Sequence, residues 1–388
     1  MIEKRVSVPF HLADIGDREI EAVVETLKSG WLTTGSRARQ FETEFAAYIG
    51  AAHGVALNSA TAGLHLALEA AGVREGDEVI VPTMTFAASA EVVAYLRAKP
   101  VLVDCDPDTL TVRAEDIAPA IGPRTKAIMP VHYGGHPCEM DPILELAKTH
   151  KLAVIEDAAH ALPAAYRGRR IGTIGDLTVF SFYATKTLTT GEGGMVTTDD
   201  PQFADRMRLM SLHGISRHAW NRYSAEGSWR YEILAAGFKY NLTDIAAALG
   251  LAQLRRVDEM ASARRRVATA YNCAFSSVPE LQVPVRHADV EHAWHLYPIR
   301  LRLERLRIGR DAFIEGLKEQ GIGTSVHFIP LHLHPYYREA SDHRADAFPV
   351  ATEEFGRLIS LPIYPAMTDH DIERVTGAVI ELATVHRR

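Results

Sequence analysis

The sequence predicts an α/β protein with a mostly parallel sheet between helices and a smaller C-terminal α+β unit. Between about residue 50 and residue 200, short apolar runs alternate with amphipathic segments whose apolar residues recur at helical spacing. The short runs are continuously apolar rather than alternating, as in strands that are buried on both faces. The chain has 388 residues, of which 47% are apolar and 23% charged, enough for two domains with a large core.

The strands of the predicted sheet follow one another through the first half of the chain. They are expected at 53–59, 77–82, 100–106, 126–132, 152–157, 177–182 and 193–199. Helices are expected at 62–72 and 86–98, between the first three strands. Ligands bind outside the carboxyl ends of parallel strands, so the polar residues that follow these strands are candidates for a functional site.

Helical segments and a second unit flank this sheet. An N-terminal helix is expected over 14–29, with Gly30 as its glycine C-cap, and a long arginine-rich helix over 245–269. The other elements are expected as a helix at 206–212, a strand at 292–303, a helix at 309–320, a strand at 323–331 and helices at 346–359 and 369–385. The chain is therefore divided into a large domain, 1–260, and a small domain, 261–388.

Composition and charge exclude several classes of protein. With 42 basic and 49 acidic residues the formal charge is −7, which argues against nucleic acid as the main partner, because phosphate binding favours a basic face. No stretch approaches the roughly 18 uninterrupted apolar residues of a membrane span, so no membrane association is expected. The sequence shows no export signal, and its three cysteines lack CxxC spacing, so the expected location is the cytoplasm.

Metal and hydrolase motifs are not found. The histidines nearest to a cluster are loosely spaced and have no accompanying cysteine or HExxH motif, so no metal site is expected. They are His327, His332, His334 and His343. The sequence also contains no GxSxG motif and no P-loop.

The segment DLTVFSFYATKTLTTGEGGMVTTD is the most informative one. Lys186 follows an apolar run and precedes the glycine cluster at 191–194. A surface lysine in a glycine-rich turn is the simpler interpretation. However, Ser181 and Thr185 place hydroxyls beside it, and the glycines would let the backbone approach a planar ligand. A partly desolvated lysine at a strand end is suited to Schiff-base chemistry with a carbonyl cofactor.

The segment LAVIEDAAHA ends a predicted strand with two carboxylates. Glu156 and Asp157 lie at the strand end, and His160 follows three residues later. One interpretation is that Asp157 caps a following helix. The other is that it pairs with a protonated heteroaromatic nitrogen, which pyridoxal phosphate needs for its ring to act as an electron sink. Both interpretations stay open on these residues alone.

Two further segments add an anion site and an aromatic ring. In NSATAGL, a strand turns into a helix at Ser59, Ala60 and Thr61, so free backbone N–H groups and hydroxyls could bind an anion. An ordinary N-cap explains one of these hydroxyls equally well. In PTMTF, Phe86 follows a strand end and is either part of the core or available to stack on a cofactor ring.

The order of these motifs resembles the DegT/StrS family of sugar aminotransferases. The similar segments are SGWLTTG, NSATAGL, PTMTF, IEDAAHA, SFYATKTLTTGEGG, GFKYNLTDIAAALGLAQL and GIGTSVHF, which together cover nearly the whole chain. Enzymes of this family have fold type I, similar in architecture to aspartate aminotransferase. The resemblance therefore implies pyridoxal 5'-phosphate (PLP) as the cofactor.

The resemblance also implies roles for individual residues. Lys186 would form the Schiff base with PLP, Asp157 would pair with the ring nitrogen, and His160 would lie beside the ring or its 3-hydroxyl. The other implied cofactor-binding residues are Phe86, which would stack on the ring, and Ser59, Ala60, Thr61 and Ser181, which would surround the phosphate.

A homodimer with shared active sites is implied as well. In this family a polar residue of the segment that matches GFKYN reaches the cofactor phosphate of the neighbouring subunit. Many relatives have GYNYR at this point, so Lys239 and Asn241 are both candidates here.

The substrates follow from the resemblance alone. SGWLTTG, PVHYGG and HAWHLYPIR look most like enzymes that use L-glutamate to aminate C4 of a dTDP- or UDP-linked 4-ketosugar, releasing 2-oxoglutarate. Some members of the family are dehydratases and carry His in place of the Schiff-base lysine, so the intact Lys186 argues against dehydration. Amination at C3 and a PLP-binding regulatory protein without turnover are kept as alternatives. Candidates for binding the nucleotide diphosphate are Arg217, Arg222, Arg230 and Lys239.

Overall fold

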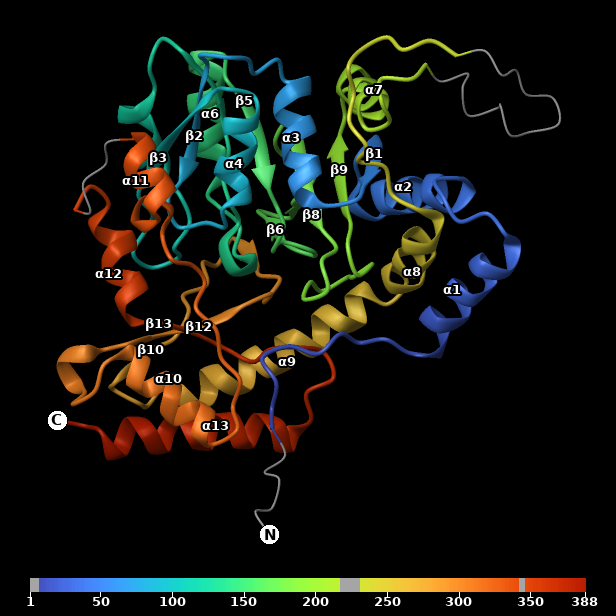
Figure 1. The fold of residues 1–388 in the computed structure, drawn as a ribbon. Helices are drawn as coiled ribbons and strands as arrows, with labels where there is room; N and C mark the ends of the chain where they lie inside the picture. The colour runs from blue at the N-terminus through green and yellow to red at the C-terminus, as the bar shows by residue number, and fades with distance from the viewer. Residues whose placement is uncertain (1–6, 217–230, 342–345) are drawn as a thin grey trace.

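The computed structural model describes residues 7–216, 231–341 and 346–388. Its centre is a seven-stranded sheet with the order β1-β9-β8-β5-β4-β2-β3 (Figure 1). The strands are β1 (His53–Leu57), β2 (Glu78–Pro82), β3 (Lys99–Val103), β4 (Thr125–Ile128), β5 (Ala153–Asp157), β8 (Leu177–Ser181) and β9 (Gly194–Thr198). All neighbours pair in parallel except β9, which is antiparallel to β8 and β1. The predicted α/β class is confirmed.

Helices cover both faces of this sheet. One face packs against α3 (Ala60–Ala70), α4 (Ala88–Tyr95) and α7 (Pro201–Met210), the other against α2 (Ser36–Ile49), α6 (Met140–His150) and α8 (Asp244–Leu254). On β2, Val79 and Val81 belong to the first hydrophobic cluster and Ile80 to the second, which explains why the strand is continuously apolar. The sequence predictions include neither α2 nor α6, although the buried residues of α2 recur at helical spacing.

The long helix predicted over 245–269 is two helices. α9 (Val257–Phe275) begins after Arg256, whose backbone (φ −115°, ψ 3°) lies outside the helical region. The Arg256 guanidinium donates to Asp14 and to the buried Glu19 at 2.8 and 3.0 Å. These ion pairs fix the break between α8 and α9 to the N-terminal segment that contains Asp14 and Glu19. No helix of the described ranges, this pair included, is long and apolar enough to cross a membrane.

The N-terminal helix α1 (Asp17–Ser29) ends as predicted. Gly30 has a φ of +75°, which glycine adopts without strain, and its backbone N–H bonds to Leu27 O. The helix begins at Asp17 rather than Asp14, because the N-cap Gly16 has an extended backbone and its N–H bonds to Glu19 Oε2 at 2.9 Å.

The C-terminal part surrounds a three-stranded antiparallel sheet. Its strands are β10 (Leu281–Gln282), β12 (Tyr297–Leu301) and β13 (Leu358–Leu361). Residues of α9, α10 (Arg310–Glu319) and α13 (Asp369–Val385) join them in a third hydrophobic cluster (Figure 1). α12 (Pro349–Arg357) gives way directly to β13, which is why the helix predicted over 346–359 is shorter. Division of the chain at residue 260 stays a proposal, which this separate cluster supports.

The strand predicted over 323–331 is wrong. Ser325 makes one bridge to Ser360 on β13, and the chain then runs irregularly until a short 3-10 helix (Leu331–Leu333), which precedes α11 (Pro335–Ser341). The segment cannot pair with β12, because β10 and β13 already pair with its two edges. The sequence predictions do not include β13. The irregular segment instead brings His327 and Phe328 to the cavity described below.

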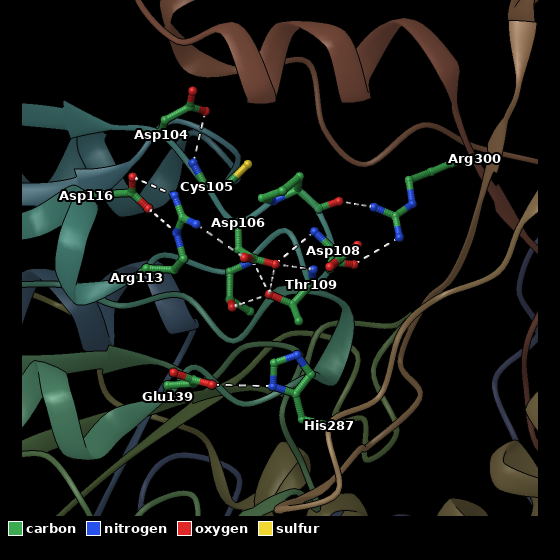
Figure 2. Close-up of polar contacts among 12 residues, drawn as sticks. Asp104, Cys105, Asp106, Asp108, Thr109, Arg113, Asp116, Glu139, His287 and Arg300 are labelled. Carbon is green, nitrogen blue, oxygen red and sulfur yellow. Dashed lines mark hydrogen bonds and ion pairs between the residues drawn. The ribbon is translucent and has the colours of Figure 1, made fainter. Parts of the chain in front are cut away.

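Arg300 on β12 joins the C-terminal part to the large sheet. Its side chain is buried and donates to the backbone carbonyls of Pro107 and Asp108, in the loop after β3 (Figure 2). From the same loop, the Asp104 carboxylate accepts hydrogen bonds of 3.0 and 2.9 Å from two backbone N–H groups in the first turn of α12. A side chain of each part therefore bonds to the backbone of the other, and these contacts fix the two parts to each other.

Candidate active site

A cavity of about 500 Å³ opens at the carboxyl ends of the parallel strands. It lies beyond the ends of β1, β2, β5 and β8, where the sequence predicts a functional site. Eight of the ten predicted site residues line it: Ser59, Ala60, Thr61, Phe86, Asp157, His160, Ser181 and Lys186. The sheet thus brings together residues from four separate segments of the chain.

The N-terminus of α3 forms one end of this cavity. Ser59 is an ordinary N-cap, because its Oγ accepts the N–H of Ala62 at 3.0 Å. The N–H groups of Ala60 and Thr61 precede the first intrahelical bond, so they can bind an anion. A side chain at Gly194 would come within 2.6 Å of the Ser59 backbone, so only glycine lets β9 pass this close to the helix start.

Asp157 lies at the end of β5 and does not cap a helix. No helix follows it; the chain turns instead, and Asp157 Oδ1 accepts the N–H of Ala159 at 3.1 Å. Its Oδ2 accepts the hydroxyl of Ser89 at 2.7 Å, and Ser89 is in turn 2.8 Å from the hydroxyl of Thr85. The helix-cap interpretation is therefore wrong, and the carboxylate is held beside the cavity.

The neighbouring carboxylate, Glu156, points to the other face of the strand, as adjacent strand residues do. It is fully buried and bonds to His132 Nε2 at 2.9 Å, to Thr178 Oγ1 at 2.7 Å and to the Gly175 N–H. The His132 pair holds the pKa of Glu156 low against the effect of burial. Glu156 does not line the cavity and is part of the hydrogen-bonded core.

Lys186 lies in the loop between β8 and β9. Its backbone N–H bonds to Tyr183 O at 2.9 Å, which fixes a turn at the cavity edge. Burial lowers the pKa of the Lys186 amine to about 8, the Asp157 carboxylate acts in the opposite direction, and the Arg264 charge lowers it further. Lys186 is partly buried and lines the cavity, so the surface-lysine interpretation does not hold.

His160 and Phe86 belong to an aromatic group around Phe328. His160 stacks on Phe328 with ring centroids 5.8 Å apart and an interplanar angle of 12°, and the Phe86 centroid is 6.0 Å from that of Phe328. Phe86 is 60% exposed, so its ring is not buried in the core. His160 Nδ1 accepts the Gly134 N–H at 3.3 Å, and burial followed by the charge of Lys186 places its pKa well below the usual value.

The other two predicted residues, Lys239 and Asn241, do not line the cavity of their own subunit. The Lys239 amine donates to Asn241 Oδ1, and Asn241 Nδ2 donates to Thr34 Oγ1 at 2.6 Å. Their segment lies beside the end of β1, where Asn58 N–H bonds to Tyr240 O at 2.7 Å. Lys239 is exposed, so it is available to another molecule.

Several cavity residues are absent from the sequence predictions for the site. Phe10 and His11 come from the segment before α1, His295 precedes β12, and His327 and Phe328 come from the irregular segment after α10. Two of the segments similar to the family, HAWHLYPIR and GIGTSVHF, contain the last three residues and could have identified them. No local pattern marks Phe10 or His11, because their position depends on how the N-terminal segment crosses the C-terminal part.

Other candidates of the sequence stand apart from this site. Arg217, Arg222, Arg230 and His343 lie outside the described residues. His332 contacts Thr83 and Thr352. Within the part of the chain that the structure describes, no three His, Cys, Asp or Glu side chains are grouped so that they could hold a metal ion.

The chain matches an aminotransferase family over nearly its whole length. Residues 13–380 match the DegT/DnrJ/EryC1/StrS aminotransferase family. The chain is 52% identical to the uncharacterised protein MJ1066 of Methanocaldococcus jannaschii over 387 residues, 100% of each chain. It is 49% identical to the spore coat polysaccharide biosynthesis protein SpsC of Bacillus subtilis over 384 residues, 98% of this chain and 99% of SpsC.

A solved structure agrees with this match. Spr1654 of Streptococcus pneumoniae, assigned as a sugar aminotransferase, superimposes in its pyridoxamine phosphate form with a TM-score of 0.92 at 33% identity, covering 97% of this chain and 99% of Spr1654. A PLP form of the same protein superimposes with a TM-score of 0.91. The predicted fold type I architecture and the predicted cofactor are confirmed. The chain belongs to the DegT/DnrJ/EryC1/StrS aminotransferase family and is a PLP-dependent sugar aminotransferase.

Proposed function

We propose that this enzyme transfers the amino group of L-glutamate to the C4 keto carbon of a dTDP- or UDP-linked 4-ketosugar. The products are a 4-amino sugar nucleotide and 2-oxoglutarate. The observation that carries the proposal is the single cavity in which Lys186, Asp157 and the N-terminus of α3 converge. The similarity of SGWLTTG, PVHYGG and HAWHLYPIR to C4-aminating enzymes supports the position of amination.

The residues around the cavity fit PLP. The N–H groups of Ala60 and Thr61 suit its phosphate, together with the hydroxyl of Ser181. The Asp157 carboxylate suits its protonated ring nitrogen, and the exposed ring of Phe86 suits stacking on its pyridine ring. Ser59 contributes as the cap that orders the helix start.

We assign His160 to the 3-oxygen side of the cofactor ring. Because its Nδ1 accepts the Gly134 N–H, the neutral imidazole carries its proton on Nε2. Its pKa lies well below the usual range, mainly because of burial, so the ring stays neutral at physiological pH. A neutral donor of this kind can bind an anionic oxygen without adding a second positive charge beside Lys186.

Lys186 is the proposed acid and base. Bound PLP supplies an electron sink for the carbon that loses its proton. With a pKa of about 8, the Lys186 amine can remove a proton from the α-carbon of glutamate and later deliver one to the sugar carbon that receives the nitrogen. Because one amine serves both carbons, holding each substrate beside Lys186 also gives a proximity effect.

We further propose that the enzyme is a homodimer in which Lys239 or Asn241 completes the partner's phosphate site. The face of α1 supports this proposal, since Ile20, Val24 and Leu27 recur at helical spacing and are 53%, 38% and 50% exposed. Lys239 and Asn241 lie outside their own cavity, as residues that serve a neighbouring subunit would.

Two further expectations remain proposals. Lys239 is a candidate for contacting the nucleotide diphosphate and belongs to the part of the chain that the structure describes. The other candidates, Arg217, Arg222 and Arg230, lie outside that part. The cytoplasm is the proposed location, which the free state of all three cysteines supports.

An assay over a panel of substrates tests the proposed function. The enzyme, loaded with PLP, is incubated with glutamate and dTDP- or UDP-linked 4-ketosugars, with the corresponding 3-ketosugars as matched controls, and products are identified by NMR. A 4-amino product supports the proposal, and a 3-amino product from the controls alone replaces it with C3 amination. If glutamate alone causes no change in the cofactor absorbance, the protein is a PLP-binding protein without turnover.

A further inference from the structure

Three histidines that have no role in the account above line the same cavity. His11 precedes α1, His295 precedes β12, and His327 lies in the irregular segment after α10. We call these three residues the histidine wall. All three come from the N-terminal segment and the C-terminal part, whereas the residues that fit PLP come from the large sheet.

The hydrogen bonds of the histidine wall leave ring nitrogens free. His11 Nε2 lies 2.9 Å from Ala184 O. Since a carbonyl only accepts, Nε2 carries the proton, and Nδ1 of the neutral ring is a bare acceptor. His327 uses Nδ1 for Ser360 Oγ at 3.0 Å, which leaves its Nε2. Nδ1 of the buried His295 has no hydrogen-bond partner in the described chain.

Burial, with two nearby cations, lowers the pKa values of the histidine wall. Arg264 is 1% exposed and donates to Ile363 O at 2.7 Å and to His295 O at 3.4 Å, and no carboxylate in the described residues pairs with it. Burial, then Arg264 and Lys186, lower the pKa of His11 to about 4. Burial and Lys186 lower that of His327 to about 4, and burial with the same cations places that of His295 well below its usual value.

A bare imidazole nitrogen selects the kind of ligand that can bind beside it. A hydroxyl can donate a hydrogen bond to His11 Nδ1, whereas a carboxylate oxygen would place one lone pair against another. The buried and unpartnered Nδ1 of His295 also gains from a ligand that supplies a hydrogen-bond partner, because an unpartnered polar atom away from water is costly. A sugar ring with several hydroxyls can both donate and accept at these nitrogens, whereas each carboxylate of the amino donor can only accept.

We propose that the histidine wall recognises the hydroxyl groups of the acceptor sugar, with His11 Nδ1 accepting a hydrogen bond from one ring hydroxyl. This inference rests on the proposed function, because it names the part of the site that holds its sugar substrate. It predicts that the two halves of the reaction depend on different residues of one cavity: the wall contributes to amination of the sugar and not to reaction with glutamate.

The two half-reactions, measured separately by cofactor absorbance, test this inference. His11→Phe removes the acceptor and retains an aromatic ring beside Tyr364, whose centroid is 6.4 Å from that of His11. We expect its glutamate half-reaction to stay within about twofold of wild type, which also shows that the variant is folded and loaded. The rate of its half-reaction with dTDP-4-keto-6-deoxyglucose or the UDP-linked 4-ketosugar should fall about tenfold, which corresponds to the loss of one neutral hydrogen bond. His150→Phe, at an exposed position of α6, is the control.

Deoxy analogues of the same sugar locate the contact. With the 2-deoxy or the 3-deoxy analogue, wild type should lose about the same tenfold, and His11→Phe should lose nothing further. An equal loss in both half-reactions, or an effect of His11→Phe that is the same on all three sugars, would overturn the inference while leaving the proposed function intact. Failure of wild type to aminate any nucleotide-linked sugar would contradict the proposed function and the inference together.

Discussion

Ser89 Oγ donates a hydrogen bond to Asp157 Oδ2 at 2.7 Å, and both side chains are buried. Because an ionised carboxylate can only accept, Thr85 Oγ1, 2.8 Å from Ser89 Oγ, must in turn donate to Ser89. Two hydroxyls in series therefore hold one carboxylate oxygen, while the Ala159 N–H holds the other at 3.1 Å. This chain fixes the orientation of the carboxylate assigned to the cofactor nitrogen.

Removal of the Ser89 hydroxyl should weaken cofactor binding and turnover together. A hydrogen bond to a charged group contributes about 1.5–3 kcal/mol, so Ser89→Ala should reduce kcat by about tenfold or more and raise the Kd for PLP. Ser276→Ala, which changes an exposed serine after α9, is the matched control. A Ser89→Ala enzyme with unchanged kcat and unchanged Kd for PLP would show that Asp157 does not need this support.

Asp157→Asn should keep PLP bound but lose most of the activity. An amide cannot hold a positive charge on the pyridine nitrogen, so the ring becomes a poorer electron sink, and we expect kcat to fall by about a hundredfold or more. Cofactor content from the absorbance spectrum and turnover with glutamate measure the two effects separately. Near-normal turnover of the loaded variant would remove Asp157 from the proposed chemistry.

The reactivity of Lys186 in the apoprotein should depend on pH in a specific way. Its pKa is lowered to about 8, so the neutral, nucleophilic fraction reaches one half near pH 8 and is nearly complete above about pH 9. The rate of its trinitrophenylation, followed on the Lys186 peptide by mass spectrometry, should level off accordingly. A model lysine peptide, with a pKa of about 10.4, should continue to gain rate up to pH 10.

The same titration has an internal control. The Asp157 carboxylate stabilises the charged form of Lys186, so Asp157→Asn should move the midpoint to lower pH. A midpoint near 10 in wild type would contradict the burial of the amine in this cavity.

Mixed dimers should show whether active sites are shared. Lys186→Ala protein and a Lys239→Ala/Asn241→Ala protein are each expected to be inactive. If Lys239 or Asn241 serves the neighbouring subunit, a hybrid dimer contains one doubly damaged site and one intact site, and activity should return after subunit exchange. If each subunit builds its own site, every site stays damaged. Absence of recovery, with exchange verified by mass spectrometry of differently labelled subunits, would refute the shared site.

The strands of the large sheet and most of the candidate site can be predicted from local sequence. These strands are short apolar runs, and residues that line the cavity lie at or just after their carboxyl ends, as Asp157 ends β5 and Ser181 ends β8. These features need no knowledge of distant contacts. The same holds for Gly30, whose left-handed conformation ends α1.

Features that depend on distant residues could not be predicted in this way. The break between α8 and α9 is held by Arg256 with Asp14 and Glu19, more than two hundred positions away in the sequence. The helix-cap interpretation of Asp157 assumed a helix that the chain does not form there. His11 reaches the cavity only because the N-terminal segment crosses the C-terminal part, where Val8 bridges to Ile322.

Identification of the lysine that binds the cofactor tests the central claim most directly. The enzyme loaded with PLP is reduced with borohydride, digested and mapped by mass spectrometry, with Lys126→Ala, at an exposed position of β4, as a matched control for Lys186→Ala. We expect the pyridoxyl group on Lys186 in wild type and in the control. Lys186→Ala should stay folded, because the substitution removes a desolvated amine, but should carry no label and no transaminase activity. A pyridoxyl group on any other lysine, or transamination by Lys186→Ala, would contradict the account.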